Sequence, residues 1–125
     1  MKYLALAVFA LGILVAGCDT PSGSTCPPLE ADRPTYASFG QAFFTEYCTD
    51  CHSANSANRH GAPGDQNFDT EADIKKHAGS IDTEAASGPD ATNTSMPERS
   101  PNVLTTPSVE ERKLLGQYLA CLKAQ

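Results

Sequence analysis

One short motif constrains this chain of 125 residues more than any other feature: Cys48-Thr49-Asp50-Cys51-His52. The C-x-x-C-H spacing sets two thiols about one helical turn apart and places an imidazole directly after the second. A thioredoxin-type dithiol also uses C-x-x-C, but there the motif follows a strand, and nothing upstream of Cys48 alternates as a strand does. A zinc site would need a second Cys/His pair at short spacing. The other Cys and His residues outside the N-terminal segment stand singly: Cys26, His60, His77 and Cys121.

The same pattern is the one that attaches haem covalently to a protein. The thiols of Cys48 and Cys51 each add across one vinyl group of a single haem, and His52 then lies under the iron as its proximal ligand. The pattern occurs once in the chain. The sequence therefore predicts one covalently bound haem c.

The first 17 residues are predicted to be a signal peptide. Lys2 supplies a positive charge, and residues 3–16 are almost wholly apolar but too short to span a bilayer comfortably. This run ends in Leu14-Val15-Ala16-Gly17-Cys18, which is similar to a bacterial lipoprotein lipobox with Cys18 as the lipidated first residue. Ordinary cleavage with an incidental Cys18 is the alternative. Both interpretations predict export, and the lipobox predicts a lipid anchor at the periplasmic face of a bacterial membrane.

Cleavage before Cys18 would leave 125 − 17 = 108 residues and, by removing Lys2, change the formal net charge from −6 to −7. This acidity argues against a nucleic-acid partner and favours a partner protein with a basic docking face. Residues 18–33 are rich in Pro, Ser, Thr and Gly, so the lipidated cysteine is expected to be followed by a flexible tether. Residues 34–125 are expected to form one domain.

That domain is short of apolar side chains. Residues 34–125 hold 13 Leu, Ile, Val and Phe in 92 positions, about 14%, and folded chains normally exceed roughly 20%. A buried haem would supply the missing apolar surface, so the cofactor is expected to form part of the core.

Apolar spacing predicts helices over residues 35–47, from about Thr70, and from about Thr106 to Ser108 onward. Ser108 and Glu111 match a capping box, and Thr70 with Asp73 resembles one. No segment alternates as a strand, so the predicted fold class is all-α. The second helix is expected to bury Ile74, Ala78 and Ile81. The last helix is expected to bury Leu114, Leu115, Tyr118, Leu119 and Leu122.

With these features the chain resembles the small class I c-type cytochromes. Gly40 and Phe44 precede the haem motif at the spacing of that family, and Leu115 and Tyr118 look like the Leu and aromatic of its last helix. A glycine lets two helices approach closely, and an aromatic ring fills the crossing. The resemblance covers most of residues 34–124. It implies a cytochrome c-like fold in which three to four helices wrap around one covalently bound haem.

The resemblance also implies a sulfur ligand on the face of the haem opposite His52. Met96 is the only Met besides Met1, and it precedes Pro97 as the ligand Met does in many family members. Met/His ligation is the pattern of cytochromes c. A gap-filling core Met is the alternative. His60 and His77 are rival ligands that are more simply interpreted as surface residues.

The resemblance implies one further role, and the remaining residues suggest two more. Pro63 corresponds to the loop proline whose carbonyl accepts a hydrogen bond from the proximal imidazole; an ordinary turn proline is the alternative. In an exported protein the two spare cysteines, Cys26 and Cys121, suggest a disulfide, and two unrelated thiols are the alternative. The family brings the two ends of the chain together, but this bridge is not a general feature of the family. Arg59 and Arg99 could each pair with a haem propionate, although surface placement is the simpler interpretation.

These expectations predict an electron carrier and not an enzyme. A haem with both axial positions filled has no open position for a substrate, so no small-molecule substrate is expected. The predicted partners are redox proteins, together with the membrane that holds the lipid anchor. The alternative is an open-site haem enzyme or sensor, or a haem subunit of a larger oxidoreductase complex.

Overall fold

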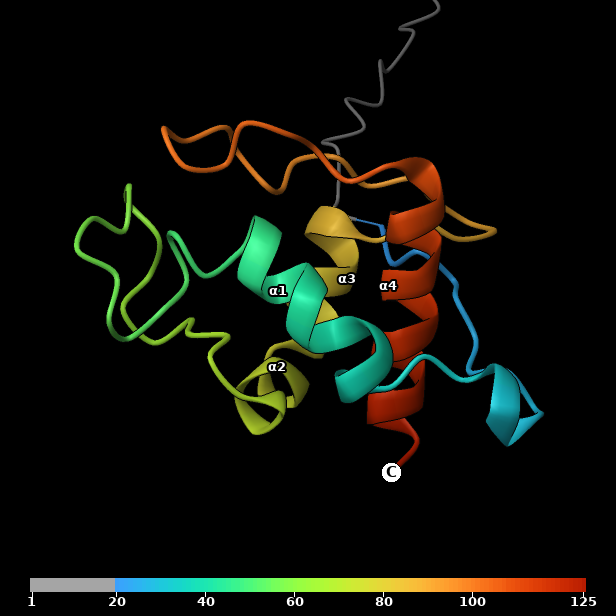
Figure 1. Cartoon of the computed structure of the whole chain (residues 1–125). Coiled ribbons are helices and arrows are strands. Elements are labelled where there is room, and N and C mark those ends of the chain that lie inside the picture. The colour runs from blue at the N-terminus through green and yellow to red at the C-terminus, as the bar shows by residue number, and fades with distance from the viewer. Residues whose placement is uncertain (1–19) are drawn as a thin grey trace, which may run out of the picture.

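A computed structural model describes residues 20–125 (Figure 1). Within that range the chain forms four α-helices and no strand, and one isolated antiparallel bridge pairs Ser87 with Thr92. The predicted all-α class is therefore confirmed. No helix among these residues is both long and apolar enough to cross a membrane. The predicted signal peptide, residues 1–17, and the predicted lipidation site, Cys18, lie outside the described residues.

The first helical segment runs into the C-x-x-C-H motif. A π-helical turn, Tyr36–Gly40, continues directly into α1, Gln41–Tyr47, as the sequence predicts. Thr35 caps its start: Thr35 Oγ1 accepts from the Ser38 N–H at 3.0 Å, and Ser38 Oγ accepts from the Thr35 N–H at 2.9 Å. Because α1 ends at Tyr47, the C-x-x-C-H motif begins directly after the last residue of the helix.

Two short helices replace the single second helix that the sequence predicts. They are α2, Glu71–Lys76, and α3, Ala78–Ala85, and they break at His77. Thr70 caps α2 by accepting from the Asp73 N–H at 3.2 Å. The predicted stripe is nevertheless buried in full: Ile74, Ala78 and Ile81.

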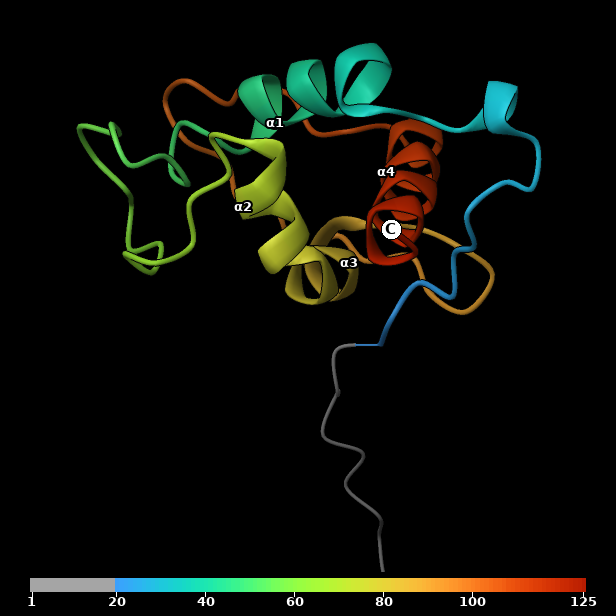
Figure 2. The same cartoon turned by 90° about the horizontal axis from the view of Figure 1, so that it is seen from below.

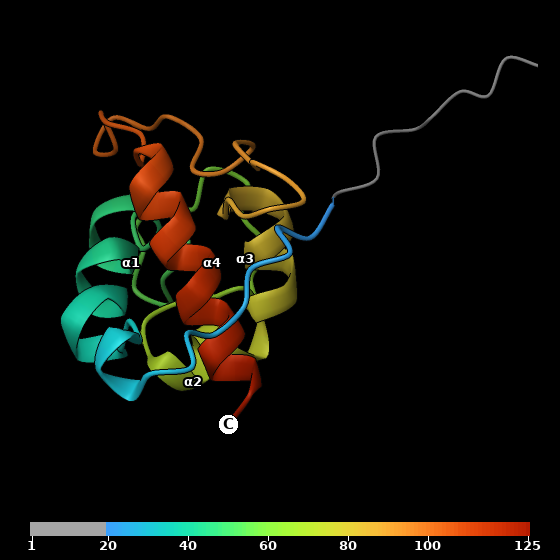
Figure 3. The same cartoon turned by 90° about the vertical axis from the view of Figure 1, so that its right-hand side faces the viewer.

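The longest helix, α4, spans Val109–Lys123 and lies between α1 and α3 (Figure 3). The predicted capping box is present, with the Glu111 N–H donating to Ser108 Oγ at 3.2 Å and the Ser108 N–H donating to Glu111 Oε2 at 2.8 Å. Leu114 was predicted to be buried, but it is 41% exposed. This prediction is wrong because Leu114 lies about 100° around the helix axis from the buried Leu115. Arg112, three positions before Leu115, is buried instead.

Gly40 and Tyr118 form the predicted crossing between the first helical segment and α4. A Cβ atom on Gly40 would lie 2.8 Å from Cζ of Tyr118, so only glycine permits this approach. Phe44 packs beside the crossing, with its ring centroid 6.5 Å from that of Tyr118. Figure 2 looks along α4 from its C-terminal end, with α1 on one side and α3 on the other.

The described part of the predicted tether is packed against the helices. We call residues 20–29 the N-terminal strap; it crosses α4 in Figure 3. Ser22 is fully buried and donates from Oγ to Asp82 Oδ1 at 2.5 Å and from its N–H to Asp82 Oδ2 at 3.2 Å. The tether prediction is therefore wrong for this part. Small polar residues, which resemble a linker in composition, here make buried hydrogen bonds.

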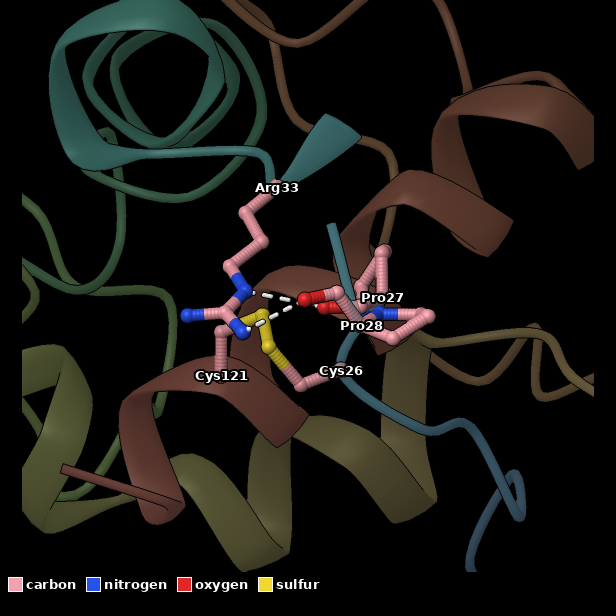
Figure 4. Close-up of a disulfide and its surroundings, with 5 residues drawn as sticks. All are labelled: Cys26, Pro27, Pro28, Arg33 and Cys121. Atoms are coloured by element: carbon pink, nitrogen blue, oxygen red, sulfur yellow. Dashed lines mark hydrogen bonds between the residues drawn. A yellow bond between two sulfur atoms is a disulfide. The ribbon is translucent and has the colours of Figure 1, made fainter. Parts of the chain in front are cut away.

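A disulfide joins the strap to the last helix. Cys26 is bonded to Cys121 of α4, and their Cα atoms lie 4.6 Å apart (Figure 4). Close by, Arg33 donates to the carbonyls of Pro27 at 2.8 Å and Pro28 at 3.0 Å. The disulfide predicted from the two spare cysteines is thus present in the structure. It holds the strap along α4.

Candidate cofactor site

One cavity of about 360 Å³ brings the motif together with a distant loop. Cys48, Cys51 and His52 line it from the end of α1, and Met96 lines it from the connection between α3 and α4. Side chains from α3 and from residues 59–68 complete the wall. The volume falls within the range of about 300–1,000 Å³ that is usual for small-molecule and cofactor sites. The four residues that the sequence singles out for haem binding therefore share one space.

Both thiols of the motif are free and protonated at neutral pH. Burial, with a smaller effect from the neighbouring Cys51, raises the pKa of Cys48 to about 12. Burial and the nearby Asp50 carboxylate raise the pKa of Cys51. A redox-active dithiol needs a thiol pKa below its ordinary value, because the thiolate is the attacking species. The surroundings of this pair do not favour that chemistry.

His52 is held in one tautomer and one orientation. The residue is 8% exposed, and its Nδ1 lies 3.1 Å from the backbone oxygen of Gln66. Because a carbonyl oxygen only accepts, Nδ1 must carry the hydrogen, which leaves the lone pair on Nε2. Burial lowers the pKa of His52, so the ring is neutral at pH 7. Phe68 stacks on it with ring centroids 4.6 Å apart. Such a ring is prepared to bind a metal through Nε2.

The partner of His52 is a correction to the sequence prediction. Pro63 lines the cavity, but its carbonyl accepts from Arg59 Nη2 and not from the imidazole. A turn closed by the Gln66 N–H on the Pro63 carbonyl, at 3.1 Å, brings Gln66 against the ring. The family resemblance thus identified the correct loop and the correct kind of bond, but a residue three positions too early.

Met96 is fixed by its backbone on both sides. Its N–H donates to the Glu84 carbonyl at 2.9 Å, and its carbonyl accepts from Arg112 Nη1 at 2.8 Å. Arg112 is 4% exposed and also donates to the carbonyls of Ala85 and Asn93 at 2.7 and 2.9 Å. The sequence prediction missed Arg112. Its only signal is its position three residues before Leu115, on the apolar face of α4.

The remaining candidates are distributed around the site. His60 and Arg99 line the cavity as exposed residues. His77 is not among the lining residues, and its Nε2 donates to the Asp65 carbonyl at 3.1 Å. Arg59 lines the cavity and is half-buried, with all five of its N–H groups hydrogen-bonded. The interpretation of Arg59 as a simple surface residue is therefore wrong.

The residues around the cavity fit a haem better than a metal ion held by the protein alone. Across residues 20–125 no three His, Cys, Asp or Glu side chains converge as such an ion would require. A porphyrin supplies four nitrogen ligands itself, so one imidazole and one thioether complete the iron. A second hollow, of about 470 Å³, is lined mainly by polar residues and by none of the four residues that bear this chemistry.

Comparisons with known proteins add no relative: no protein-family model, no curated protein and no solved structure matches this chain.

Proposed function

We propose that this chain is a monohaem c-type cytochrome with a cytochrome c-like fold, which carries single electrons between redox partners in the bacterial cell envelope. The observation that carries the proposal is the convergence of Cys48, Cys51, His52 and Met96 on one cavity. A haem bound there would supply one iron atom that gains and loses a single electron.

Cys48 and Cys51 would hold the group covalently. Each S–H adds across one vinyl double bond, with sulfur bonding to one carbon and hydrogen to the other, so no net oxidation or reduction is needed. Burial raises the pKa of both thiols, so neither is readily oxidised. A protonated pair resists oxidation to a disulfide and stays available for attachment.

His52 and Met96 would fill the two axial positions. The Gln66 carbonyl keeps the hydrogen on Nδ1 of His52 and so directs the Nε2 lone pair at the metal. The hydrogen bonds of Met96 to Glu84 and Arg112 fix the backbone from which its sulfur projects. Two filled positions leave no place for a substrate, which favours electron transfer over catalysis.

The rest of the proposal concerns location and partners. Cys18 would carry a lipid at the periplasmic face of a bacterial membrane. The chain beyond residue 17 has 15 acidic and 9 − 1 = 8 basic side chains. A redox partner with a basic docking face therefore fits it best, and charge would steer the encounter.

Haem attachment is tested by mass spectrometry of the denatured protein, after expression with a haem-attachment machinery. The wild-type chain should retain one haem, and a Cys48→Ser/Cys51→Ser variant should retain none. A Cys26→Ser/Cys121→Ser variant is the matched control, because it also loses two cysteines but should keep the haem. Release of haem from the wild type by acid–organic extraction would contradict the proposal.

Carbon monoxide separates a carrier from an open-site haem protein. The reduced wild type should not bind it, because Met96 closes the iron. Met96→Ala should open that position, bind carbon monoxide and lower the reduction potential. Equal binding by the wild type and Met96→Ala would show that Met96 is not a ligand.

A further inference from the structure

Arg59 is the centre of an irregular loop on the His52 side of the cavity. We call residues 53–69, which contain no helix or strand, the proximal loop. A guanidinium group has five N–H donors in a rigid fork, and here five hydrogen bonds occupy it. The acceptors are Asn67 Oδ1, at 2.7 Å, and the backbone carbonyls of Ser53, Ala62, Pro63 and Gln66.

The backbone after Arg59 is shaped to surround this side chain. The Ala62 N–H donates to the Arg59 carbonyl at 2.9 Å, closing a tight turn. Both central residues of the turn have positive φ, 50° at His60 and 89° at Gly61, as type I′ turns require. The chain therefore reverses at once, and residues 62–67 fold back over the guanidinium.

One of the five acceptors connects Arg59 to the site. The Gln66 carbonyl accepts from Arg59 Nη2 and from His52 Nδ1, each at 3.1 Å. Its two lone pairs are thereby both used. The Gln66 N–H bonds to Pro63, whose carbonyl is also held by Arg59. Arg59 therefore holds the Gln66 oxygen directly, and through Pro63 it also holds the turn that carries Gln66.

We propose that Arg59 is the positioning residue of the His52 imidazole, acting through the Gln66 carbonyl. The inference rests on the proposed function, because it takes Nε2 of His52 as an iron ligand. Without Arg59 the loop would loosen and the Nδ1–H bond would weaken. The imidazole would then be a weaker donor to the oxidised iron, and the reduction potential would rise.

The test measures solvent exchange of the His52 Nδ1–H by NMR in the reduced holoprotein, together with the reduction potential. Arg59→Gln should accelerate this exchange about tenfold, the effect of losing one hydrogen bond, and should raise the potential. Arg59→Lys keeps the charge but not the fork, and should also accelerate exchange. Arg33→Gln is the matched control: it removes the same charge from an arginine that clamps two carbonyls away from the cavity (Figure 4). Neither quantity should change in it.

A reference amide separates a local effect from general destabilisation. The Leu119 N–H, in the buried middle of α4, should exchange at the wild-type rate in every variant. Acceleration of Leu119 equal to that of His52 would overturn the inference, as would an unchanged Nδ1–H rate in a haem-bearing Arg59→Gln protein. If Arg59→Gln does not fold, Arg59→Lys decides by the same two rates. A wild type without covalent haem would overturn both the proposed function and the inference.

Discussion

Two long connections border the cavity, and one arginine holds each of them in a different way. In the proximal loop, Arg59 bonds only to acceptors within eight residues of itself. In residues 86–107, which we call the distal loop, the holding residue is Arg112 of α4. Its acceptors lie 16 to 27 residues away in sequence. The arginine of the proximal loop is therefore a local support, whereas the arginine support of the distal loop depends on the packing of α4.

The N-terminal strap adds to this difference. The Ser22 carbonyl accepts from the Asp90 N–H at 3.0 Å, and Ser24 Oγ donates to the Ser87 carbonyl at 3.1 Å. The strap thus contacts the distal loop and α4, on which it lies. A Cβ on Gly116 would come 2.2 Å from Ser24 Oγ, which shows how closely the strap approaches the helix. Changes in the strap or α4 should therefore reach Met96 before they reach His52.

Arg112→Met should have the largest effect. It removes the side-chain donor to one buried and two part-buried carbonyls, and we expect a loss of about 3 kcal/mol in the free energy of unfolding. Urea denaturation measures this. Met96 should detach, so the reduced variant should bind carbon monoxide while His52 Nδ1–H exchange stays slow. Lys113→Met is the control, since it loses only an exposed ion pair with Glu110. If His52 Nδ1–H exchange accelerated together with the detachment of Met96, the expected difference between the two loops would be contradicted.

Removal of the disulfide should have a comparable effect on stability and a smaller one on the haem site. It closes a loop with a sequence separation of 95, for which the chain-entropy argument gives about 4–5 kcal/mol as an upper figure, and about 3 kcal/mol is typical. Cys26→Ser/Cys121→Ser should melt at a lower temperature with its haem spectrum intact. Hydrogen exchange should rise in the distal loop more than in the proximal loop. Non-reducing peptide mapping that finds both wild-type thiols free would remove the basis of this prediction.

Ser22→Ala tests the strap with a single hydroxyl. It removes the hydroxyl that donates to the buried Asp82 carboxylate at 2.5 Å. We therefore expect a loss of about 1–2 kcal/mol in the free energy of unfolding. Thr25→Ala, at an exposed position of the same strap, should cost almost nothing. If Ser22→Ala and Thr25→Ala were equally stable, residues 20–29 would behave as the flexible tether that their composition predicts.

The smallest effect is expected at His60, within the proximal loop. Its φ of 50° is unfavourable for a residue with a Cβ, whereas glycine adopts it freely but loses more entropy on folding. His60→Gly should therefore change the free energy of unfolding by less than about 0.5 kcal/mol. His60→Val should destabilise by about 1 kcal/mol. Thermal melts of both haem-bearing variants compare them, and a stable Val variant would mean that the turn is not required.

The sequence predicts the parts of the structure that depend on local patterns, such as periodic apolar residues and helix caps. The boundaries near Thr70 and Ser108 follow from capping residues, and the approach of Gly40 to Tyr118 follows from residue size. The spacing of Cys48, Cys51 and His52 places them together because they adjoin one helix end. Met96 was identified by its rarity and by the family resemblance, not by any periodic pattern.

The sequence did not reveal the side chains that hold backbone carbonyls. Arg59 and Arg112 act through such bonds, and these leave no period and need no particular residue type at the accepting end. For the same reason Gln66 could not be chosen over Pro63, since any residue carries a carbonyl. Ser22 bonds instead to the side chain of Asp82, 60 positions away in sequence. The break at His77 was missed because the buried stripe continues through it.

The burial of Ser22 also limits the length of chain between the proposed lipid anchor and the folded domain. If Cys18 carries the proposed lipid, only four positions separate the anchor from a residue fixed to α3, a reach of at most about 14 Å. The 16-residue tether expected from composition would have reached about 55 Å. A connection this short leaves the domain little freedom to rotate or to move away from the membrane surface. Its electron partner would then have to reside in the same membrane or dock close to that membrane's surface. There the shared membrane raises the effective concentration of the two proteins.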